Sequence, residues 1–367
     1  EDDPIVLAKR DDIDVFVELI GGESGQAKKA TEEAIKHGKH VVTANKAMLA
    51  IHGQELASAA ENSGVNLRFE AAVAGGIPVI KTLTESLAGN NITRIMGVMN
   101  GTCNYILTRM EDTGLAYEEI FEEANQLGFL EADPNLDVGG IDAAHKLVLL
   151  SSIAYGTQVD FNGAILEGIG RITIEDIKAA SEMGYRIKLL GVSSLSDSGL
   201  SQTMRPCLVP LTSPLAQLNG GTNMIIIEGD AVGQIVLRGA GAGEGPTASA
   251  VIADILDIAR GINIPVFGQP ANSLIKVPAI STSVENSFYL RLNLKDEAGI
   301  LAKVSAALAN VGISIDRIRQ EGHEKDAAPV IIVTHPTDRD TLNKAISEIE
   351  ETSAAIDPPV VLRIESV

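Results

Sequence analysis

The sequence predicts an α/β protein with a partial doubly wound, Rossmann-like domain, an α+β middle domain and a C-terminal ferredoxin-like domain. Residues 14–20 have the pattern of a buried strand, glycines then turn the chain into a helix that runs to about residue 37, and residues 41–44 form the next strand. This β-α-β alternation is typical of half of a parallel doubly wound sheet. Residues 287–367 alternate in β-α-β-β-α-β order, which indicates a ferredoxin-like arrangement.

The start of the chain lacks one expected feature of a dinucleotide-binding fold. No Gly-x-Gly-x-x-Gly pattern follows a strand before residue 14, and the first residue is not methionine. A fold of this type holds the pyrophosphate of the dinucleotide on that glycine turn. We therefore expect the chain to lack the first β-α-β unit of its cofactor domain. The alternative is a divergent protein that never bound a dinucleotide.

Local patterns predict the remaining elements. Residues 173–236 alternate helical and strand patterns, and residues 265–287 carry three prolines and many small residues, which is typical of a connector. Predicted strands lie at 65–69, 92–98, 224–227, 288–294, 313–319, 329–334 and 360–364, and helices at 100–110, 142–150, 248–262, 300–311 and 338–350. The expected division is a nucleotide-binding domain at 1–86 and 237–266, a substrate-binding, catalytic and dimerisation domain at 87–236, a connector at 267–286 and a regulatory domain at 287–367.

Composition excludes several classes of protein. The chain of 367 residues is 45% apolar, enough for two or three domains with real cores. A net charge of −20 argues against nucleic acid or an anionic membrane as a partner. No apolar stretch approaches the ~18 to 20 residues of a membrane span. Two cysteines without metal-ligand spacing favour a reducing compartment, so we expect a cytoplasmic protein.

The most informative segment is residues 131–146. It brings Glu131, Asp133, Asp137 and Asp142 together with Lys146, at the end of a loop and in the first turns of an apolar helix. Asp142 and Lys146 are four residues apart, with the acid nearer the N-terminus, which is the favourable order for an ion pair on one helix face. These residues predict a site for a small amino acid. The alternative for any single residue is a capped helix with a surface salt bridge.

Three other segments carry candidate site residues. Lys46 follows a strand end, where open α/β sheets bind ligands. Glu70 precedes small residues whose exposed carbonyl oxygens suit a hard cation, although the same pattern also fits a plain turn before a helix. The helix that begins at Asn100-Gly101-Thr102 offers backbone N–H groups to an α-carboxylate, and these residues also suit a simple helix cap. Cys103 could be a nucleophile, but a lone cysteine after a turn that contains glycine is more often a buried packing residue.

Several motifs together resemble one enzyme family. Val42-Thr43-Ala44-Asn45-Lys46, Phe69-Glu70-Ala71-Ala72-Val73-Ala74-Gly75-Gly76-Ile77-Pro78, Asn100-Gly101-Thr102-Cys103-Asn104-Tyr105, the 131–146 run and Gly239-Ala240-Gly241-Ala242-Gly243 resemble motifs of homoserine dehydrogenases, in the same order. The final module, with Asp296-Glu297-Ala298-Gly299 at its first turn, resembles an ACT domain. One departure is Phe129, where the family commonly has tyrosine.

The resemblance implies a reaction and a set of roles. Such an enzyme reduces L-aspartate 4-semialdehyde to L-homoserine with NADPH or NADH, and Lys146 would supply the proton while Asp142 orients it. The implied substrate contacts are Glu131 with the α-ammonium, Asp137 with the hydroxyl, and Asp133, Asn100, Gly101 and Thr102. Lys46 is implied to be catalytic, near the substrate, and also to contact the nicotinamide end of the cofactor. The other implied cofactor contacts are Gly21 and Gly243, and a sodium-type monovalent cation would be bound by Glu70, Val73, Gly75 and Ile77.

The resemblance also implies partners. The ACT domain would bind an amino-acid effector, with threonine as the guess from the family, and the enzyme would be a homodimer or homotetramer. The ACT module could instead be an oligomerisation module without a ligand. Two alternatives to the whole interpretation remain: an amino-acid-binding regulatory assembly without turnover, and another amino-acid-linked reductase of similar architecture.

Overall fold

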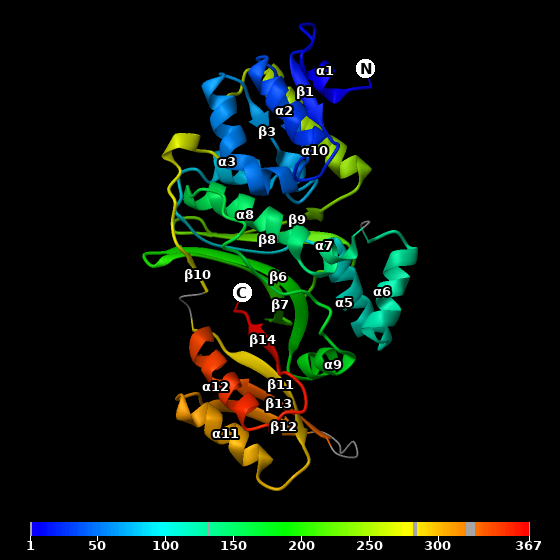
Figure 1. Cartoon of the computed structure of the whole chain (residues 1–367), viewed down its shortest axis with the longest axis vertical. Coiled ribbons are helices and arrows are strands. Elements are labelled where there is room, and N and C mark those ends of the chain that lie inside the picture. The colour runs from blue at the N-terminus through cyan, green and yellow to red at the C-terminus, as the bar shows by residue number, and fades with distance from the viewer. Residues whose placement is uncertain (1, 131–132, 282–284, 321–326, 367) are drawn as a thin grey trace.

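The computed structural model describes residues 2–130, 133–281, 285–320 and 327–366. Figure 1 shows three parts stacked along the long axis: a small α/β part that contains the N-terminus, a long curved sheet in the middle, and a C-terminal part with two helices on a sheet. Among the residues that are described, no helix has both the length and the apolar character that crossing a membrane requires.

The small α/β part is built on a parallel sheet. Its three strands, β1 (Val15–Glu18), β2 (His40–Thr43) and β3 (Leu67–Arg68), lie in the order β1-β2-β3. The predicted β-α-β unit is therefore confirmed within one or two residues at each end. The helices of this part are α1 (Pro4–Ala8), α2 (Gln26–Lys36), α3 (Lys46–Asn62) and α10 (Glu244–Ala259), which returns from far along the chain to pack on β2.

The middle of the molecule is an antiparallel sheet covered by helices. It contains β4 (Ile92–Val98), β6 (Tyr185–Ser196), β7 (Gly199–Pro210), β8 (Thr222–Gly229) and β9 (Gly233–Ala240), with β5 (Ile165–Leu166) and β10 (Ala279–Ile280) paired to β7. The helices of this region are α4 (Val79–Lys81), α5 (Gly101–Thr113), α6 (Tyr117–Gln126), α7 (Pro134–Val138), α8 (Ile141–Tyr155) and α9 (Ile174–Glu182).

Helix α8 lies between the small sheet and the large one (Figure 1). It packs on α3 on one side and on β4, β6 and β7 on the other. Its side chains from Asp142 to Ile153 are all buried, which is the pattern of a helix enclosed on every side. The sequence prediction that Lys146 lies in a buried helix is confirmed, and this position sets up the site described below.

The C-terminal part has the predicted ferredoxin-like order. Its elements are β11 (Phe288–Lys295), α11 (Ile300–Asn310), β12 (Ile315–Gln320), β13 (Ala327–Thr334), α12 (Arg339–Glu351) and β14 (Val360–Ile364). What the sequence did not predict is that this sheet continues into the middle one. Strand β14 pairs in parallel with β7, so the strand order β12-β13-β11-β14-β7-β6-β4-β8-β9 is continuous.

Within the segment predicted as a plain connector, residues 267–286, the described residues include regular secondary structure. The segment contains a short helix, Ala271–Ser273, and the strand β10, which pairs in parallel with the start of β7. The prolines that suggested a connector permit this, because a two-residue edge pairing needs few backbone donors.

A buried carboxylate joins the C-terminal part to the middle one. Asp176, fully buried in the first turn of α9, accepts hydrogen bonds from the Tyr289 hydroxyl at 2.8 Å and from the Arg291 guanidinium at 2.7 Å. Its other oxygen accepts the backbone N–H of Thr173, closing a capping box. One side chain therefore caps a helix and fixes strand β11.

We predict that Asp176→Ala lowers the free energy of unfolding by roughly 3 kcal/mol, because it leaves the largely buried Arg291 charge without its partner. Urea denaturation followed by circular dichroism measures this loss. The exposed Asp316→Ala on β12 is the control, with a change within about 0.5 kcal/mol. Equal, small effects of both variants would contradict the assigned role of Asp176.

Candidate active site

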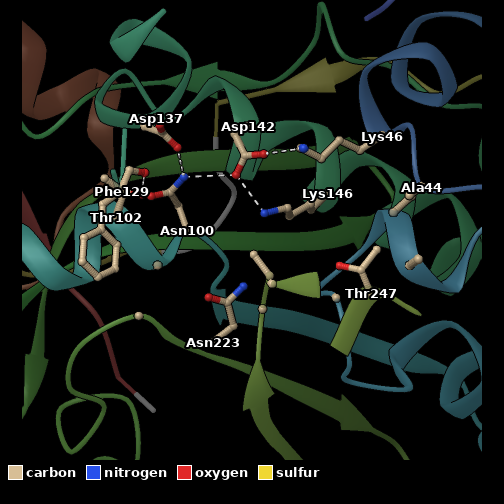
Figure 2. A pocket seen from close by; sticks show the side chains of 18 of the residues that line it. Ala44, Lys46, Asn100, Thr102, Phe129, Asp137, Asp142, Lys146, Asn223 and Thr247 are labelled. Atoms are coloured by element: carbon tan, nitrogen blue, oxygen red, sulfur yellow. Dashed lines mark hydrogen bonds and ion pairs between the residues drawn. The ribbon is translucent and has the colours of Figure 1, made fainter. Parts of the chain in front are cut away.

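A cavity of about 590 Å³ lies where the ends of the small sheet face α8 and the large sheet. Its lining comes from segments far apart in the sequence, and Figure 2 shows their side chains converging from opposite sides. The lining residues are Ala44, Lys46, Ala71, Ala72, Gly75, Asn100, Gly101, Thr102, Gly128, Phe129, Asp137, Asp142, Lys146, Gly221, Asn223, Gly241, Ala242, Gly243 and Thr247.

Asp142 is the centre of the polar network in this cavity (Figure 2). Its carboxylate lies 2.8 Å from the Lys146 ammonium through Oδ2 and 3.0 Å from the Lys46 ammonium through Oδ1. The Asn100 amide donates to Asp142 Oδ2 at 3.1 Å and to Asp137 Oδ1 at 2.8 Å. Two carboxylates, two ammonium groups and one amide, predicted from three separate motifs, are thus within one network.

The electrostatics of Asp142 follow from these neighbours. Burial alone would raise the pKa of its carboxyl, but the ammonium groups of Lys146 and Lys46 outweigh burial and hold the pKa well below its usual range. Asp142 is therefore ionised near neutral pH, and its carboxylate lies between the ammonium groups of Lys46 and Lys146 in the cavity.

Lys146 is held by a second contact besides Asp142. Its ammonium donates to the backbone carbonyl of Met99 at 2.9 Å, and the Asn223 amide donates to the same carbonyl at 3.1 Å. The residue is only 7% exposed, yet it lines the cavity. A buried ammonium in fixed hydrogen bonds, next to space for a ligand, is arranged for proton transfer.

Local structure explains where Lys46 lies. The Asn45 side chain caps α3 by accepting the N–H of Met48, and its amide donates to the carbonyl of Gly22 at 2.8 Å. Lys46 is the first residue of α3 and reaches across the cavity to Asp142. The strand-end position predicted to carry a ligand-binding lysine is thus fixed by a helix cap.

The Asn100-Gly101-Thr102 segment forms the opposite wall. Asn100 Oδ1 accepts the N–H of Cys103 at 2.8 Å, so the helix-cap interpretation of this asparagine is confirmed, while its amide faces the two aspartates. Gly101 is required here because a Cβ atom would lie 2.7 Å from the carbonyl oxygen of Gly221. Thr102 donates to the carbonyl of Phe129, and Phe129 stacks on Tyr105 at 4.4 Å.

Of the other predicted site residues, Asp133 and Gly21 lie outside the cavity lining and Gly243 lies within it. Asp133 is exposed, does not line the cavity and caps α7 by accepting the N–H of Asn135 at 3.0 Å. Glu131 lies outside the described residues. Gly21 is exposed, outside the cavity lining, and its N–H donates to Glu18. Gly243 lines the cavity with a φ of 111°, directly before α10.

The residues predicted to bind a cation form a tight turn. Glu70 is 3% exposed, and its two oxygens accept the N–H groups of Ile80 and Lys81 at 2.9 and 3.0 Å. Burial raises the pKa of Glu70 to about 7. Each carboxylate oxygen retains a further acceptor position, and a bound cation would offset the burial of the charge.

Gly75 has a φ of 55°, and a Cβ there would collide with the carbonyl of Gly241 at 2.6 Å. The donor types fit a hard monovalent cation. Within the described part of the chain, no group of three or more His, Cys, Asp or Glu side chains could hold a metal ion.

Three residues of this region were missed from the sequence. Glu18 is fully buried at the end of β1, where its carboxylate accepts the N–H groups of Ile20 and Gly21 and the Thr43 hydroxyl. Asn223 faces Lys146 across the cavity (Figure 2). Lys188 is buried on β6 behind the cavity wall. The only sequence signal for Asn223 is the glycine pair Gly220-Gly221, which ends two residues before it.

Cys103 is buried and its thiol donates to the carbonyl of Asp137. Burial, with Asp137 and Asp142 nearby, raises the pKa of this thiol well above its usual range. A thiol in that state is a poor nucleophile, in agreement with the predicted packing role.

The fold, the cavity and comparisons with known proteins together define a class: an oxidoreductase with a Rossmann-like NAD-binding domain, a catalytic domain and a C-terminal ACT domain. Three family descriptions match the chain: "Homoserine dehydrogenase, NAD binding domain" at residues 3–70, "Homoserine dehydrogenase" at 78–256 and "ACT domain" at 288–353. Homoserine dehydrogenases from Neisseria gonorrhoeae and Pseudomonas aeruginosa are each 43% identical, over 100% and 98% of this chain and 86% and 85% of their own. The chain belongs to the homoserine dehydrogenase family.

Solved structures agree with this assignment. A homoserine dehydrogenase from Thiobacillus denitrificans superposes with a TM-score of 0.93 at 42% identity, covering 100% of this chain and 85% of that one. A hyperthermophilic archaeal homoserine dehydrogenase in complex with NADPH has a TM-score of 0.62 at 28% identity, over 71% of this chain and 76% of its own. The predicted fold class and family are confirmed, and the alternative of a protein unrelated to dinucleotide binding is not supported.

The depressed pKa of Asp142 predicts a pH dependence of stability. A carboxyl whose folded pKa lies below its unfolded value of about 3.9 adds stability that is complete above that value and is lost as the pH falls through the folded pKa. The stability gap between wild type and Asp142→Asn should therefore stay constant from about pH 7 to about pH 5 and narrow as the pH falls below about 4. Urea denaturation across this range measures the gap, with exposed Asp197→Asn as control. A gap that stays constant over the whole range would contradict the ion-pair assignment.

Proposed function

We propose that this protein interconverts L-aspartate 4-semialdehyde and L-homoserine with a nicotinamide dinucleotide. The observation that carries the proposal is the Lys46–Asp142–Lys146 network, which lies in a cavity between the NAD-binding sheet and the catalytic sheet. Membership of the homoserine dehydrogenase family supports the same substrate pair.

The dinucleotide supplies the hydride when it is bound. The cavity wall formed by Gly241–Gly243, Gly75 and Ala44 suits it, because glycines let a ligand approach the backbone closely. Gly21 remains a proposed cofactor contact because the next residue, Gly22, lies beside the start of α3. There the carbonyl of Gly22 accepts a hydrogen bond from the Asn45 amide. Lys46 would lie between the nicotinamide end and the substrate. Either NADP or NAD is proposed, and the NADPH complex of the archaeal relative favours NADP.

Lys146 acts as the proton donor and acceptor. In reduction, as hydride reaches the aldehyde carbon, its Nζ–H passes a proton to the carbonyl oxygen, which becomes the homoserine hydroxyl; in oxidation the amine takes that proton back. Asp142 and the Met99 carbonyl hold Nζ in place. Lys46, on the other oxygen of Asp142, adds a positive charge that favours the developing alkoxide.

The amino-acid end of the substrate meets the opposite wall. The N-terminus of α5 at Asn100, Gly101 and Thr102 is proposed to bind the α-carboxylate, because helix starts favour anions. Asp137, fixed by the Asn100 amide, would face the hydroxyl. Glu131 keeps its proposed contact with the α-ammonium, whereas the cap at α7 gives Asp133 a supporting role at most.

The remaining expectations stay proposals. Among these are the domain limits at 86, 236, 266 and 286, a homodimer or homotetramer, a cytoplasmic location and a threonine effector at the ACT domain. The ACT match supports regulation by an amino acid. A sodium-type cation at Glu70, Val73, Gly75 and Ile77 is supported by the burial of the Glu70 carboxylate.

We expect Lys146→Met to lower kcat for L-homoserine oxidation by about 10²- to 10⁴-fold, because it removes the proton-transfer group without changing the volume of the side chain much. Initial rates of NADPH formation measure the change, and a thermal melt checks folding. The matched control is the exposed Lys178→Met, which should retain wild-type turnover. Wild-type kcat in Lys146→Met would end this assignment, and a wild type that binds homoserine but never reduces NADP would favour the regulatory alternative.

We expect the melting temperature to be higher in sodium chloride than in tetramethylammonium chloride at equal ionic strength, by about 1 °C for each 1 kcal/mol by which the cation stabilises the fold. Glu70→Gln should abolish this difference, while Glu85→Gln, an exposed control, should keep it. The same melting temperature in both salts for the wild type would refute the cation site.

A further inference from the structure

Lys188 is a buried cation that the proposed chemistry does not use. It lies on β6 with 2% of its surface exposed and does not line the cavity. Its ammonium donates to Asn104 Oδ1 at 2.8 Å and to the carbonyl of Leu218 at 2.5 Å, both neutral acceptors. Burial lowers its pKa to about 8. Since an apolar side chain of similar volume is often no less stabilising than a buried charge, stability alone does not account for this lysine.

The contacts of Lys188 converge on one loop, residues 218–221. Asn104, in the first turns of α5, donates its amide to the carbonyl of Gly220 at 2.6 Å and to that of Leu218 at 3.3 Å. Just before the loop, Arg186, the neighbouring cation on β6, donates to the carbonyl of Ala216 at 2.7 Å. Two cations of one strand thus donate hydrogen bonds to carbonyls two residues apart in the same segment, those of Ala216 and Leu218.

The far end of this loop is part of the cavity wall. Gly221 lines the cavity, its carbonyl presses against Gly101 at the start of α5, and a Cβ at Gly221 would lie 3.7 Å from the Phe129 ring. Asn223, two residues further on, reaches the Met99 carbonyl that also binds Lys146. A shift of the loop would therefore move the wall that faces the amino-acid end of the substrate.

We propose that Lys188 and Asn104 form a positioning pair, which fixes the 218–221 loop against α5 and so sets the length of amino acid that the cavity accepts. The inference rests on the proposed function. The Lys188 ammonium donates to both Asn104 Oδ1 and the Leu218 carbonyl and so holds the two groups close together. The Asn104 amide in turn donates to the carbonyl of Gly220, which restricts the position of the loop. Neither side chain touches the reacting atoms.

The test is the kinetics of Lys188→Met in the full chain. We expect KM for L-homoserine to rise about tenfold, the cost of a lost charge-assisted hydrogen bond, while KM for NADP and kcat stay within about twofold. Selectivity for homoserine over the longer L-2-amino-5-hydroxypentanoate should narrow. Lys188→Gln, which keeps N–H donors, should lose less, and Asn104→Ala should reproduce the KM effect without adding to it in the double variant.

The controls separate this inference from the proposed function. Exposed Lys178→Met should match wild type throughout. An active wild type together with unchanged homoserine KM and selectivity in Lys188→Met would overturn the positioning role alone. Equal changes in both KM values and in kcat, with Lys188→Gln no better than Lys188→Met, would also overturn it, since they indicate a general structural defect. A wild type without homoserine oxidation would remove the proposed function and this inference with it.

Discussion

One buried carboxylate, shared by two ammonium groups, determines the arrangement of the site. Asp142 belongs to α8, Lys46 starts α3 in the NAD-binding part, and Asn100 starts α5 on the catalytic sheet. A carboxylate removed from water is costly unless charges and N–H donors surround it. All three elements must therefore dock for Asp142 to be satisfied, and docking them encloses the cavity.

The same principle recurs at two other junctions. Asp176 is fully buried between α9 and strand β11, where it binds Tyr289 and Arg291. Lys188 is buried behind the cavity wall with Asn104. In each case a charged group with fixed partners sits where two parts of the chain meet. Strand β14 of the ACT domain pairs with β7, and β7 pairs with β6, the strand that carries Lys188.

The sequence predicted what local spacing can encode. The Asp142–Lys146 pair followed from four-residue spacing, the cap at Asn100 from its place before a helix, and the ferredoxin-like order of the C-terminal module from alternating patterns. The pairing of Lys46 with Asp142 joins distant segments, so no spacing reveals it. The sequence supplied only the two candidates, each from its own motif.

The places where the structure differs from the arrangement expected from the sequence have physical reasons of the same kind. Asp133 was grouped with its acidic neighbours, but a carboxylate before Pro134 is better placed to cap a short helix than to face the cavity. The N–H of Gly21 is taken by Glu18, a side chain that the pattern of a buried strand gave no reason to single out. The pairing of β14 with β7 joins strands that are far apart in the sequence. The residues of one strand do not indicate which other strand it will pair with.

The most direct test of this account is a double-mutant cycle on kcat/KM for L-homoserine with Asp142→Asn, Lys146→Met and the double variant. If Asp142 acts by holding Lys146, the double variant should be no worse than the worse single variant, because residues that act as a unit are not additive. Losses that multiply in the double variant would mean that the two residues act independently, and would contradict the central role of the shared carboxylate.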